Sequence, residues 1–312
     1  SAEGATTAGR NRQRVMMVVP TTSDPKTIGM VLTWAQRSLE RAGSTNASQE
    51  ALWLLAFACG MKHHELASRR DQAVSAEGLA RAESVVSRRM GHEPLQYILG
   101  TQEFCGLDFD VNPAVLIPRP ETELLVQETL KEGRFAEGAV VVDVGTGSGC
   151  VAVTLATILS GMRIFALDCS GDALTVAKSN AERHGVSDKI TWKEGDLLSP
   201  LHECQLIGAV DAIVSNPPYI AEEVWAGLQP EVRDFEPRLA LVAGQSGTEF
   251  HERLLHDARQ FLVPGGLLVM ELGQGQAPIV RLAAEQAGGY TGLQTIKDEA
   301  GIERVMIARR VS

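Results

Sequence analysis

The sequence has no long apolar segment, no regular cysteine spacing and no excess of basic residues. No uncharged apolar run approaches the roughly 18 residues that a membrane-spanning helix needs, so we expect no membrane contact. The five cysteines are scattered and never spaced as C-x-x-C, which favours buried reduced thiols over disulfides or a metal site. The net charge is −10, whereas a protein that binds nucleic-acid phosphates needs a basic face, so we expect no direct nucleic-acid binding.

The length of 312 residues and the hydrophobic fraction of 44% are typical of a globular protein with two domains, or with one large domain and an appendage. Residues 1–26 are small, polar and aperiodic, and we expect a disordered tail there. The pattern of the remaining chain then divides into a helical domain over 27–92, a connector over 93–118 and a larger domain over 119–312.

Apolar residues at the start of the helical domain recur at the spacing of one helix face. The residues with this spacing are Ile28, Val31, Leu32, Ala35 and Leu39. They predict a helix that ends near Gly43, and further helices are expected over about 48–60 and 75–91. In the connector, the alternation of apolar and polar residues over 104–111 predicts a strand or a β-hairpin.

Short apolar runs alternate with helical patterns in the larger domain. Strands are expected over 139–144, 163–167, 190–192, 210–214, 267–272 and 304–308. Helices are expected over 150–159, 170–184, 248–262 and 277–287. Repeated strand–helix units imply a mainly parallel sheet with helices on both faces, so the predicted fold class is a doubly wound α/β domain.

The first strand of this domain leads directly into a glycine-rich segment. Its residues are Gly145, Thr146, Gly147, Ser148 and Gly149. Glycines at alternate positions allow a tight turn and a close approach to a ligand at a helix N-terminus. Cys150 stands where the dinucleotide fingerprint G-x-G-x-x-G needs its last glycine. The spacing therefore favours a nucleoside bound without a pyrophosphate and argues against a nicotinamide dehydrogenase.

Two acidic residues are expected at the same edge of the sheet. Asp168 ends the second strand, where a carboxylate can accept hydrogen bonds from both ribose hydroxyls. The alternative role is an N-cap for the next helix, but Ser170 can supply that cap. After the third strand, Asp196 can accept from the amino group of an adenine while Leu197 packs on its ring.

The fourth strand ends in Asn216, Pro217, Pro218 and Tyr219. Two consecutive prolines stop a strand and leave few backbone donors. The Asn216 side chain and the Pro217 carbonyl are therefore presented as acceptors, with Tyr219 as an aromatic wall. A plain strand-ending turn is the alternative interpretation, but this set of residues after a buried strand favours a substrate site.

The glycine-rich segment followed by residues 216–219 resembles the S-adenosylmethionine-dependent methyltransferases that modify a planar amine or amide nitrogen. Further segments that narrow the resemblance are 94–100, 116–123, 236–237 and 239–241. Together they are similar to the PrmC/HemK family, the peptide chain release factor N5-glutamine methyltransferases. The resemblance covers about residues 27–309 and implies a Rossmann-like methyltransferase sheet with an N-terminal helical domain that recognises the protein substrate.

The resemblance implies methyl transfer from S-adenosyl-L-methionine, which leaves S-adenosyl-L-homocysteine, to a glutamine side-chain amide. The glutamine is that of the Gly-Gly-Gln motif in class 1 release factors, which act in translation termination. Asn216 and Pro217 would accept the two N–H bonds of that amide and stabilise positive charge on its nitrogen. Tyr219 would pack on the amide plane beside Pro218. The glycine-rich segment, Asp168, Asp196, Leu197 and Asn216 would contact the cofactor.

The nearest alternative is a DNA or RNA adenine N6-methyltransferase, because the same acceptors suit an exocyclic amine; the acidic charge disfavours it. A non-catalytic module that keeps only the cofactor fold is a second alternative. We expect a monomer in the bacterial cytoplasm, or in an organelle if residues 1–26 are native. Arg119, Glu121 and Glu123 are open to two roles, structural ion pairing and substrate contact.

Overall fold

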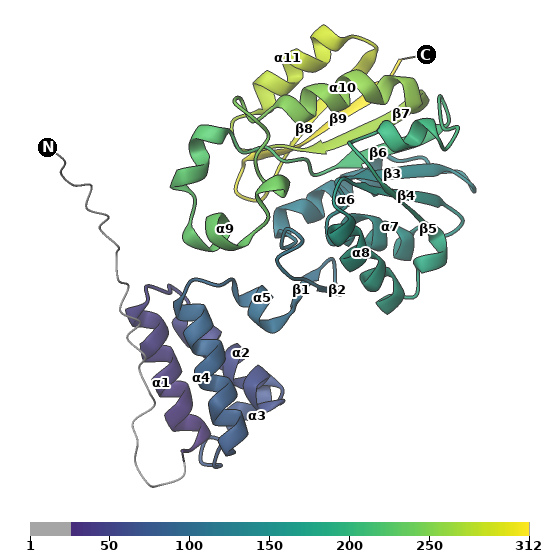
Figure 1. The fold of residues 1–312 in the computed structure, drawn as a ribbon. Coiled ribbons are helices and arrows are strands. Elements are labelled where there is room, and N and C mark those ends of the chain that lie inside the picture. Colours follow the sequence, from purple (N-terminus) through teal and green to yellow (C-terminus); the bar gives the residue numbers. More distant parts are fainter. Residues whose placement is uncertain (1–25, 312) are drawn as a thin grey trace, which may run out of the picture. The chain divides into compact units, whose positions relative to one another are not determined.

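The computed structural model of the chain describes residues 26–311, and these form two compact units (Figure 1). The first unit ends at Leu99 and the second begins at Gly100. This boundary falls inside the connector expected over 93–118. The tail expected over 1–26 lies outside the described residues, apart from Lys26. Each unit has a hydrophobic core of its own.

The first unit is entirely helical over its described residues. Its helices are α1 (Ile28–Arg41), α2 (Ala47–Cys59), α3 (His63–Ser68), α4 (Ala76–Met90) and α5 (Leu95–Leu99). The side chains of Thr27 and Ser75 cap α1 and α4 by accepting hydrogen bonds from backbone N–H groups of the first turn. A buried ion pair between Arg89 and Glu50, at 2.9 Å, joins α4 to α2. The expected N-terminal helical domain is confirmed, and α3 and α5 are additions to it.

The second unit begins with an antiparallel hairpin of β1 (Thr101–Phe104) and β2 (Leu107–Asp110). Phe104 and Phe109 bury their rings against each other and against the core of the unit. Asn180 of helix α8 (Gly171–Arg183) accepts a hydrogen bond from the backbone N–H of Asp110 at 2.7 Å. The hairpin is therefore fixed to the second unit.

A seven-stranded sheet in the order β5-β4-β3-β6-β7-β9-β8 forms the centre of the second unit. The strands are β3 (Val140–Val144), β4 (Arg163–Asp168), β5 (Ile190–Glu194), β6 (Val210–Ser215), β7 (Leu262–Glu271), β8 (Tyr290–Lys297) and β9 (Glu303–Arg310). The first five are parallel, and β9 and β8 continue the sheet in antiparallel pairing. The expected doubly wound α/β fold is confirmed. The sequence pattern had not indicated β8, and β7 begins at Leu262 rather than at 267.

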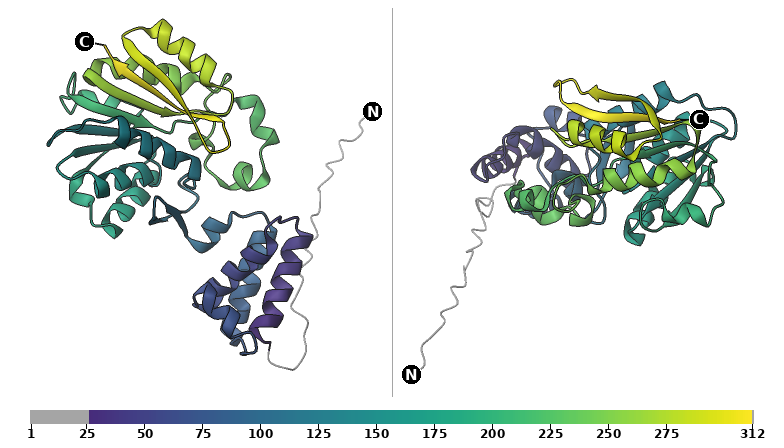
Figure 2. Two further views of the ribbon diagram at one scale, coloured as in Figure 1. Left: turned by 180° about the vertical axis from the view of Figure 1, so that it is seen from behind. Right: turned by 90° about the horizontal axis from the view of Figure 1, so that it is seen from above.

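Helices cover both faces of this sheet (Figures 1 and 2). One face packs against α6 (Pro120–Glu132), α7 (Cys150–Ile158) and α8, and the other against α10 (Glu249–Phe261) and α11 (Ala277–Ala287). The remaining short segments are η1 (Ser187–Lys189), η2 (Ser199–His202), η3 (Glu222–Gly227), α9 (Pro230–Phe235) and η4 (Arg238–Ala240). No helix among residues 26–311 combines the length and apolar composition that crossing a bilayer requires.

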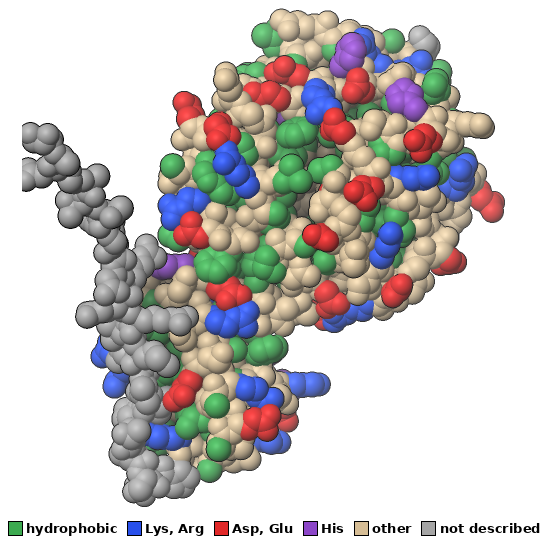
Figure 3. Space-filling model, in the orientation of Figure 1, with side chains coloured by type: hydrophobic (Ala, Val, Ile, Leu, Met, Phe, Trp, Pro, Cys, Tyr) green, Lys and Arg blue, Asp and Glu red, His purple; other side chains and the backbone are tan. Residues whose placement is uncertain are grey.

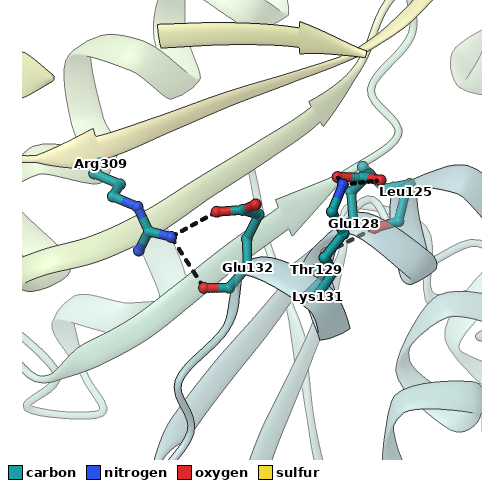
Figure 4. Close-up of polar contacts among 6 residues, drawn as sticks. All are labelled: Leu125, Glu128, Thr129, Lys131, Glu132 and Arg309. Atoms are coloured by element: carbon teal, nitrogen blue, oxygen red, sulfur yellow. Dashed lines mark hydrogen bonds and ion pairs between the residues drawn. The ribbon is translucent and has the colours of Figure 1, made fainter. Parts of the chain in front are cut away.

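Helix α6 is attached to the far strands of the sheet at its C-terminal end (Figure 4). Arg309 of β9 donates to the Glu132 carboxylate at 2.8 Å and to its main-chain oxygen at 3.0 Å. Lys131 pairs with Glu128 of the preceding turn at 2.9 Å. Pro120 occupies the first turn of the helix, where a backbone N–H would have no intrahelical acceptor, so the lack of one in proline costs no hydrogen bond. These contacts fix the helix whose first turn enters the site described next.

Candidate active site

A pocket lies at the carboxyl ends of the parallel strands β3, β4, β5 and β6. Because parallel strands end at the same edge of a sheet, their following loops gather there. The lining includes Gly145 after β3, Asp168 at the end of β4, Leu197 after β5 and Asn216 after β6. The opposite wall comes from the segment before α6, which includes Leu116.

The glycine-rich loop after β3 leaves space on its pocket side. Gly145, Gly147 and Gly149 have φ values of +73°, +55° and +82°, in the left-handed region that favours glycine. A Cβ atom at Gly145 or Gly147 would lie no closer than 3.9 Å to a protein atom. At Gly149 it would lie 3.0 Å from the Cβ of Ala177, so this glycine permits helix packing and does not line the pocket.

Asp143 holds the glycine-rich loop from within the protein. Its Oδ2 accepts the Thr146 hydroxyl at 2.6 Å and the backbone N–H of Ala152 at 3.1 Å. Burial raises the pKa of Asp143 to about 7. Thr146 and Ser148 are themselves buried and line the pocket. The loop is therefore held in place by protein contacts alone, before any ligand binds.

The Asp168 carboxylate is positioned by backbone donors on both sides. Its Oδ2 accepts from Gly147 N at 2.8 Å and its Oδ1 accepts from Ser170 N at 2.9 Å. The cap of α8 is made by Ser170, whose hydroxyl accepts from Ala173 N at 3.2 Å. Burial raises the pKa of Asp168. The hydrogen bonds from the backbone favour the charged form and lower the pKa, but their effect is smaller than that of burial. Each carboxylate oxygen keeps a further lone pair for a ligand hydroxyl.

Asp196 and Leu197 both line the pocket. The Asp196 carboxylate is largely exposed and forms an ion pair with Arg253 of α10 at 2.5 Å. Leu197 has a φ of +47°, an uncommon value for a non-glycine residue. Both residues can contact a bound nucleoside, and Arg253 shares the charge of Asp196.

The four residues after β6 are placed differently from one another. Asn216 and Pro218 line the pocket, and Pro217 is buried outside the lining. The Asn216 Nδ2 donates to the Thr122 hydroxyl of α6 at 3.1 Å, which turns its Oδ1 away from Thr122. The Tyr219 hydroxyl donates to Oε1 of Glu271 at 3.4 Å, so its phenol is anchored to β7, and Tyr219 is not among the residues that line the pocket.

Thr122 and Glu271 belong to this group of polar residues, although neither was predicted from the sequence to take part in the site. Glu271 ends β7 and is 1% exposed; burial raises its pKa to about 7. Its Oε2 accepts the Thr122 hydroxyl at 2.6 Å. One signal could have revealed Glu271: like Asp168, it is a carboxylate that ends a buried strand at this edge of the sheet.

The rim of the pocket is held by a second ion pair. Arg119 pairs with the buried Glu236, which also accepts a hydrogen bond from Ile117 N at 3.1 Å. Glu123 accepts a hydrogen bond from Cys105 N at 2.9 Å, and Glu121 is exposed at the start of α6. Two of the acidic and basic residues left open by the sequence, Arg119 and Glu123, thus make structural contacts.

These features suit a nucleoside with a substrate amine or amide beside it. The glycine-rich loop provides space, Asp168 provides acceptors for a ribose diol, and Asn216 directs an oxygen away from α6. Of these groups, the Asn216 oxygen is the one to which an N–H group of a substrate would donate.

Comparison with known proteins gives matches over both units. Residues 30–100 match the family model for the PrmC N-terminal domain, and residues 120–227 match that for the methyltransferase small domain. The release factor glutamine methyltransferase of Geobacter sulfurreducens is 44% identical over 91% of this chain and 96% of its own length. That of Moorella thermoacetica is 40% identical over 91% of this chain and 99% of its own.

Among solved structures, the hMettl16 catalytic domain in complex with MAT2A 3'UTR hairpin 6 aligns with a TM-score of 0.50. It is 19% identical and covers 74% of this chain and 81% of its own, a likeness that shows the fold alone. The family assignment rests on the sequence relatives, because they are 40–44% identical to this chain over 91% of its length. They confirm the resemblance found in the motifs: the chain belongs to the release factor glutamine methyltransferase family.

Proposed function

We propose that this chain transfers a methyl group from S-adenosyl-L-methionine to the glutamine side-chain amide of the Gly-Gly-Gln motif in class 1 peptide chain release factors. Family membership supports the reaction class and the substrate. The structural observation that carries the proposal is the Asn216 amide, whose N–H group is bound by Thr122 so that its oxygen remains for a substrate N–H.

The pocket residues fit S-adenosyl-L-methionine. Gly145 and Gly147 leave room for it, and the Asp168 oxygens can accept the two ribose hydroxyls. Asp196 and Leu197 also line the pocket and would flank the adenine. When bound, the cofactor supplies a methyl group made electrophilic by its attachment to a sulfonium sulfur.

The protein has to make a poor nucleophile react. The lone pair of an amide nitrogen is delocalised into the carbonyl group, so the nitrogen attacks weakly. The Asn216 Oδ1 and the main-chain oxygen of Pro217, a buried residue outside the lining, would accept its two N–H bonds and aim the lone pair. They would also stabilise the positive charge that develops on nitrogen as the new C–N bond forms and the bond between the methyl group and the sulfonium sulfur breaks, with its electron pair left on sulfur. Pro218, which lines the pocket, would wall the amide plane, and Tyr219 would support this wall from outside the lining. The N-alkylated amide is acidic and releases its proton to solvent, so no strong base has to contact the nitrogen.

The charge distribution supports a protein substrate over a nucleic acid. The net charge is −10. On the face of the second unit drawn in Figure 3, Lys and Arg side chains lie interspersed with Asp and Glu. A nucleic-acid substrate would need a continuous basic surface to displace counterions from its phosphates. An adenine N6-methyltransferase is therefore the less favoured candidate.

The test is methyl transfer from labelled S-adenosyl-L-methionine to three acceptors in parallel: a class 1 release factor, the same factor with its Gly-Gly-Gln glutamine changed to alanine, and double-stranded DNA with transfer RNA. We expect label on the first acceptor alone. Label on the nucleic acids, or equal label on both release factors, would contradict the proposal. The Asn216→Ala variant serves as the control for contaminating activity.

A further inference from the structure

A directed series of hydrogen bonds runs from Glu271 to Asn216. The Thr122 hydroxyl donates to Glu271 at 2.6 Å, and the Asn216 Nδ2 donates to the same hydroxyl oxygen at 3.1 Å. Glu271 and Thr122 are 1% and 2% exposed, so bulk water does not compete for these bonds. The three residues come from β7, from the first turn of α6 and from the end of β6.

The direction of every bond in the series is fixed when Glu271 is ionised, which is its state above its pKa of about 7. An ionised carboxylate has no proton to donate, so the single Thr122 hydroxyl proton points to Glu271. Toward Asn216, the Thr122 oxygen can then only accept. The asparagine amide has two orientations of nearly the same shape, and only the one that presents its NH₂ group satisfies Thr122.

We propose that Glu271 is a positioning residue that acts through Thr122 to select the reactive orientation of the Asn216 amide. In this orientation the Asn216 Oδ1 is left to accept from the substrate. In the reversed orientation the amide would present a donor to the N–H bonds of the substrate and could not hold them. The inference rests on the proposed function and names the groups that make Asn216 an acceptor.

The surroundings keep the Glu271 carboxylate in place. Tyr219 donates to its second oxygen at 3.4 Å, and a ring nitrogen of His251 in α10 lies 2.8 Å from its main-chain oxygen. The positive charge of Arg304 lowers the pKa of Glu271, and the negative charge of Glu121 raises it. Because Thr122 lies between Glu271 and Asn216, the carboxylate affects the reacting amide indirectly, by orienting a neighbour.

The series predicts that one unfavourable substitution can be repaired by a second. In Asn216→Asp, two carboxylates face the Thr122 hydroxyl, which has one proton and can satisfy only one of them. Adding Glu271→Gln supplies an NH₂ group that can donate to Thr122, so that the hydroxyl can donate to Asp at position 216. The whole series is then reversed: each group again has a partner, and the Asp at position 216 is held by Thr122 with its second oxygen free to accept from the substrate.

Single-turnover methylation of a class 1 release factor at about pH 8 would measure this repair. We expect Asn216→Asp to lower the rate by about 100-fold or more, and the double variant to recover about tenfold of that loss, although Glu271→Gln alone is slower than wild type. Binding of the release factor should stay within about twofold throughout. A double variant as slow as Asn216→Asp, or slower, would overturn the inference.

A second measurement does not depend on the substrate. The hydrogens of the Asn216 NH₂ group can be followed by NMR in the full chain with ¹⁵N-labelled asparagine. We expect slowed hydrogen exchange in wild type and in Thr122→Ser, which keeps the hydroxyl, and loss of that protection in Thr122→Val, which keeps the shape. Unchanged protection in Thr122→Val would overturn the inference even if the chain methylates release factors. If wild type methylates none, the proposed function fails and this measurement still decides the orientation of Asn216.

Discussion

Arg119 forms an ion pair with Glu236, which lies 117 residues further along the chain. Because Glu236 also accepts a hydrogen bond from Ile117 N, both of its carboxylate oxygens are occupied by the segment before α6. The pair thus ties the two segments that form the rim of the pocket, one containing Arg119 and the other Pro237 and Leu239.

Replacing Glu236 by alanine should destabilise the second unit. The change leaves a buried backbone donor and a partly exposed guanidinium without their acceptor, which costs about 1–3 kcal/mol in the free energy of unfolding. Urea unfolding measures this loss. The matched control is Glu222→Ala, which removes the exposed ion pair with Arg238 and should cost less than about 1 kcal/mol. Equal losses for the two variants would contradict the structural role of Glu236.

Replacing Asp168 by alanine should weaken S-adenosyl-L-methionine binding without unfolding the chain. The variant loses charge-assisted hydrogen bonds to the ribose, and we expect affinity to fall by about tenfold or more. Calorimetric titration measures it. Asp172, which is exposed in the first turn of α8 and does not line the pocket, provides the control carboxylate. Unchanged affinity in Asp168→Ala would remove this residue from the cofactor site.

Replacing Asn216 by alanine should lower kcat for release factor methylation by about 100-fold or more. In other enzymes, removal of one group that stabilises charge in the transition state lowers kcat by about this factor. The KM for the release factor should change little, because binding is spread over a protein surface while this interaction grows with charge on the nitrogen. Steady-state kinetics separates the two. A variant with the wild-type kcat would show that the Asn216 oxygen does not act on the reacting amide.

The free energy of unfolding should fall as pH rises from about 4.5 to about 8. Asp143 and Glu271 each have a pKa raised to about 7 by burial, so between their unfolded and folded pKa values the folded chain binds more protons than the unfolded chain. Their stabilising contribution is complete at pH values below the pKa that these groups have in the unfolded chain. It is lost as pH rises through their pKa in the folded chain. The loss is at most about 1.4 kcal/mol for each unit by which the two pKa values differ.

Urea unfolding at about pH 5 and about pH 8 measures this pH dependence. The Asp143→Asn variant keeps an oxygen to accept from Thr146 and Ala152 but carries no titratable group. It should therefore show a smaller difference between the two pH values than wild type does. A difference equal to that of wild type would show that Asp143 ionises normally in the folded chain.

A chain of residues 100–312 alone should still bind the cofactor, but it should methylate release factors poorly. All residues that line the pocket lie between Ala114 and Phe250, and the second unit has its own cores. We propose that the first unit contacts the protein substrate, so its removal should lower kcat/KM for a release factor by about tenfold or more. A short Gly-Gly-Gln peptide should be methylated equally by both chains. Full activity of the shorter chain on the release factor would contradict this division.

The parallel part of the sheet could be predicted because its strands are buried on both faces and appear as continuous apolar runs, as in Val140–Val144. Strand β8 could not, since Tyr290–Lys297 is an edge strand with several exposed positions and no clear alternation. Helix α6 was hidden by the prolines at 118 and 120, which indicate a break, although proline also suits the first turn of a helix.

The residues of the candidate site were predictable where they end a strand, as Asp168 does, or follow one directly, as Asn216 does. The segment around Thr122 had been noted only as part of a motif. Its contact with Asn216 depends on how α6 packs over the sheet, which is a tertiary arrangement without a local signal. The Arg119–Glu236 pair has the same origin, because no pattern along the chain indicates which acid meets which base.

The bond between Thr122 and Glu271 also bears on how the chain folds. These residues are 149 positions apart, and closing so large a loop costs entropy that is recovered only when the contacts it permits have formed. Strand β7, which carries Glu271, pairs with β6, and β6 pairs with β3. The arrangement proposed for Asn216 therefore needs β3, β6 and β7 paired in one sheet, and a partly folded chain without β7 would lack it.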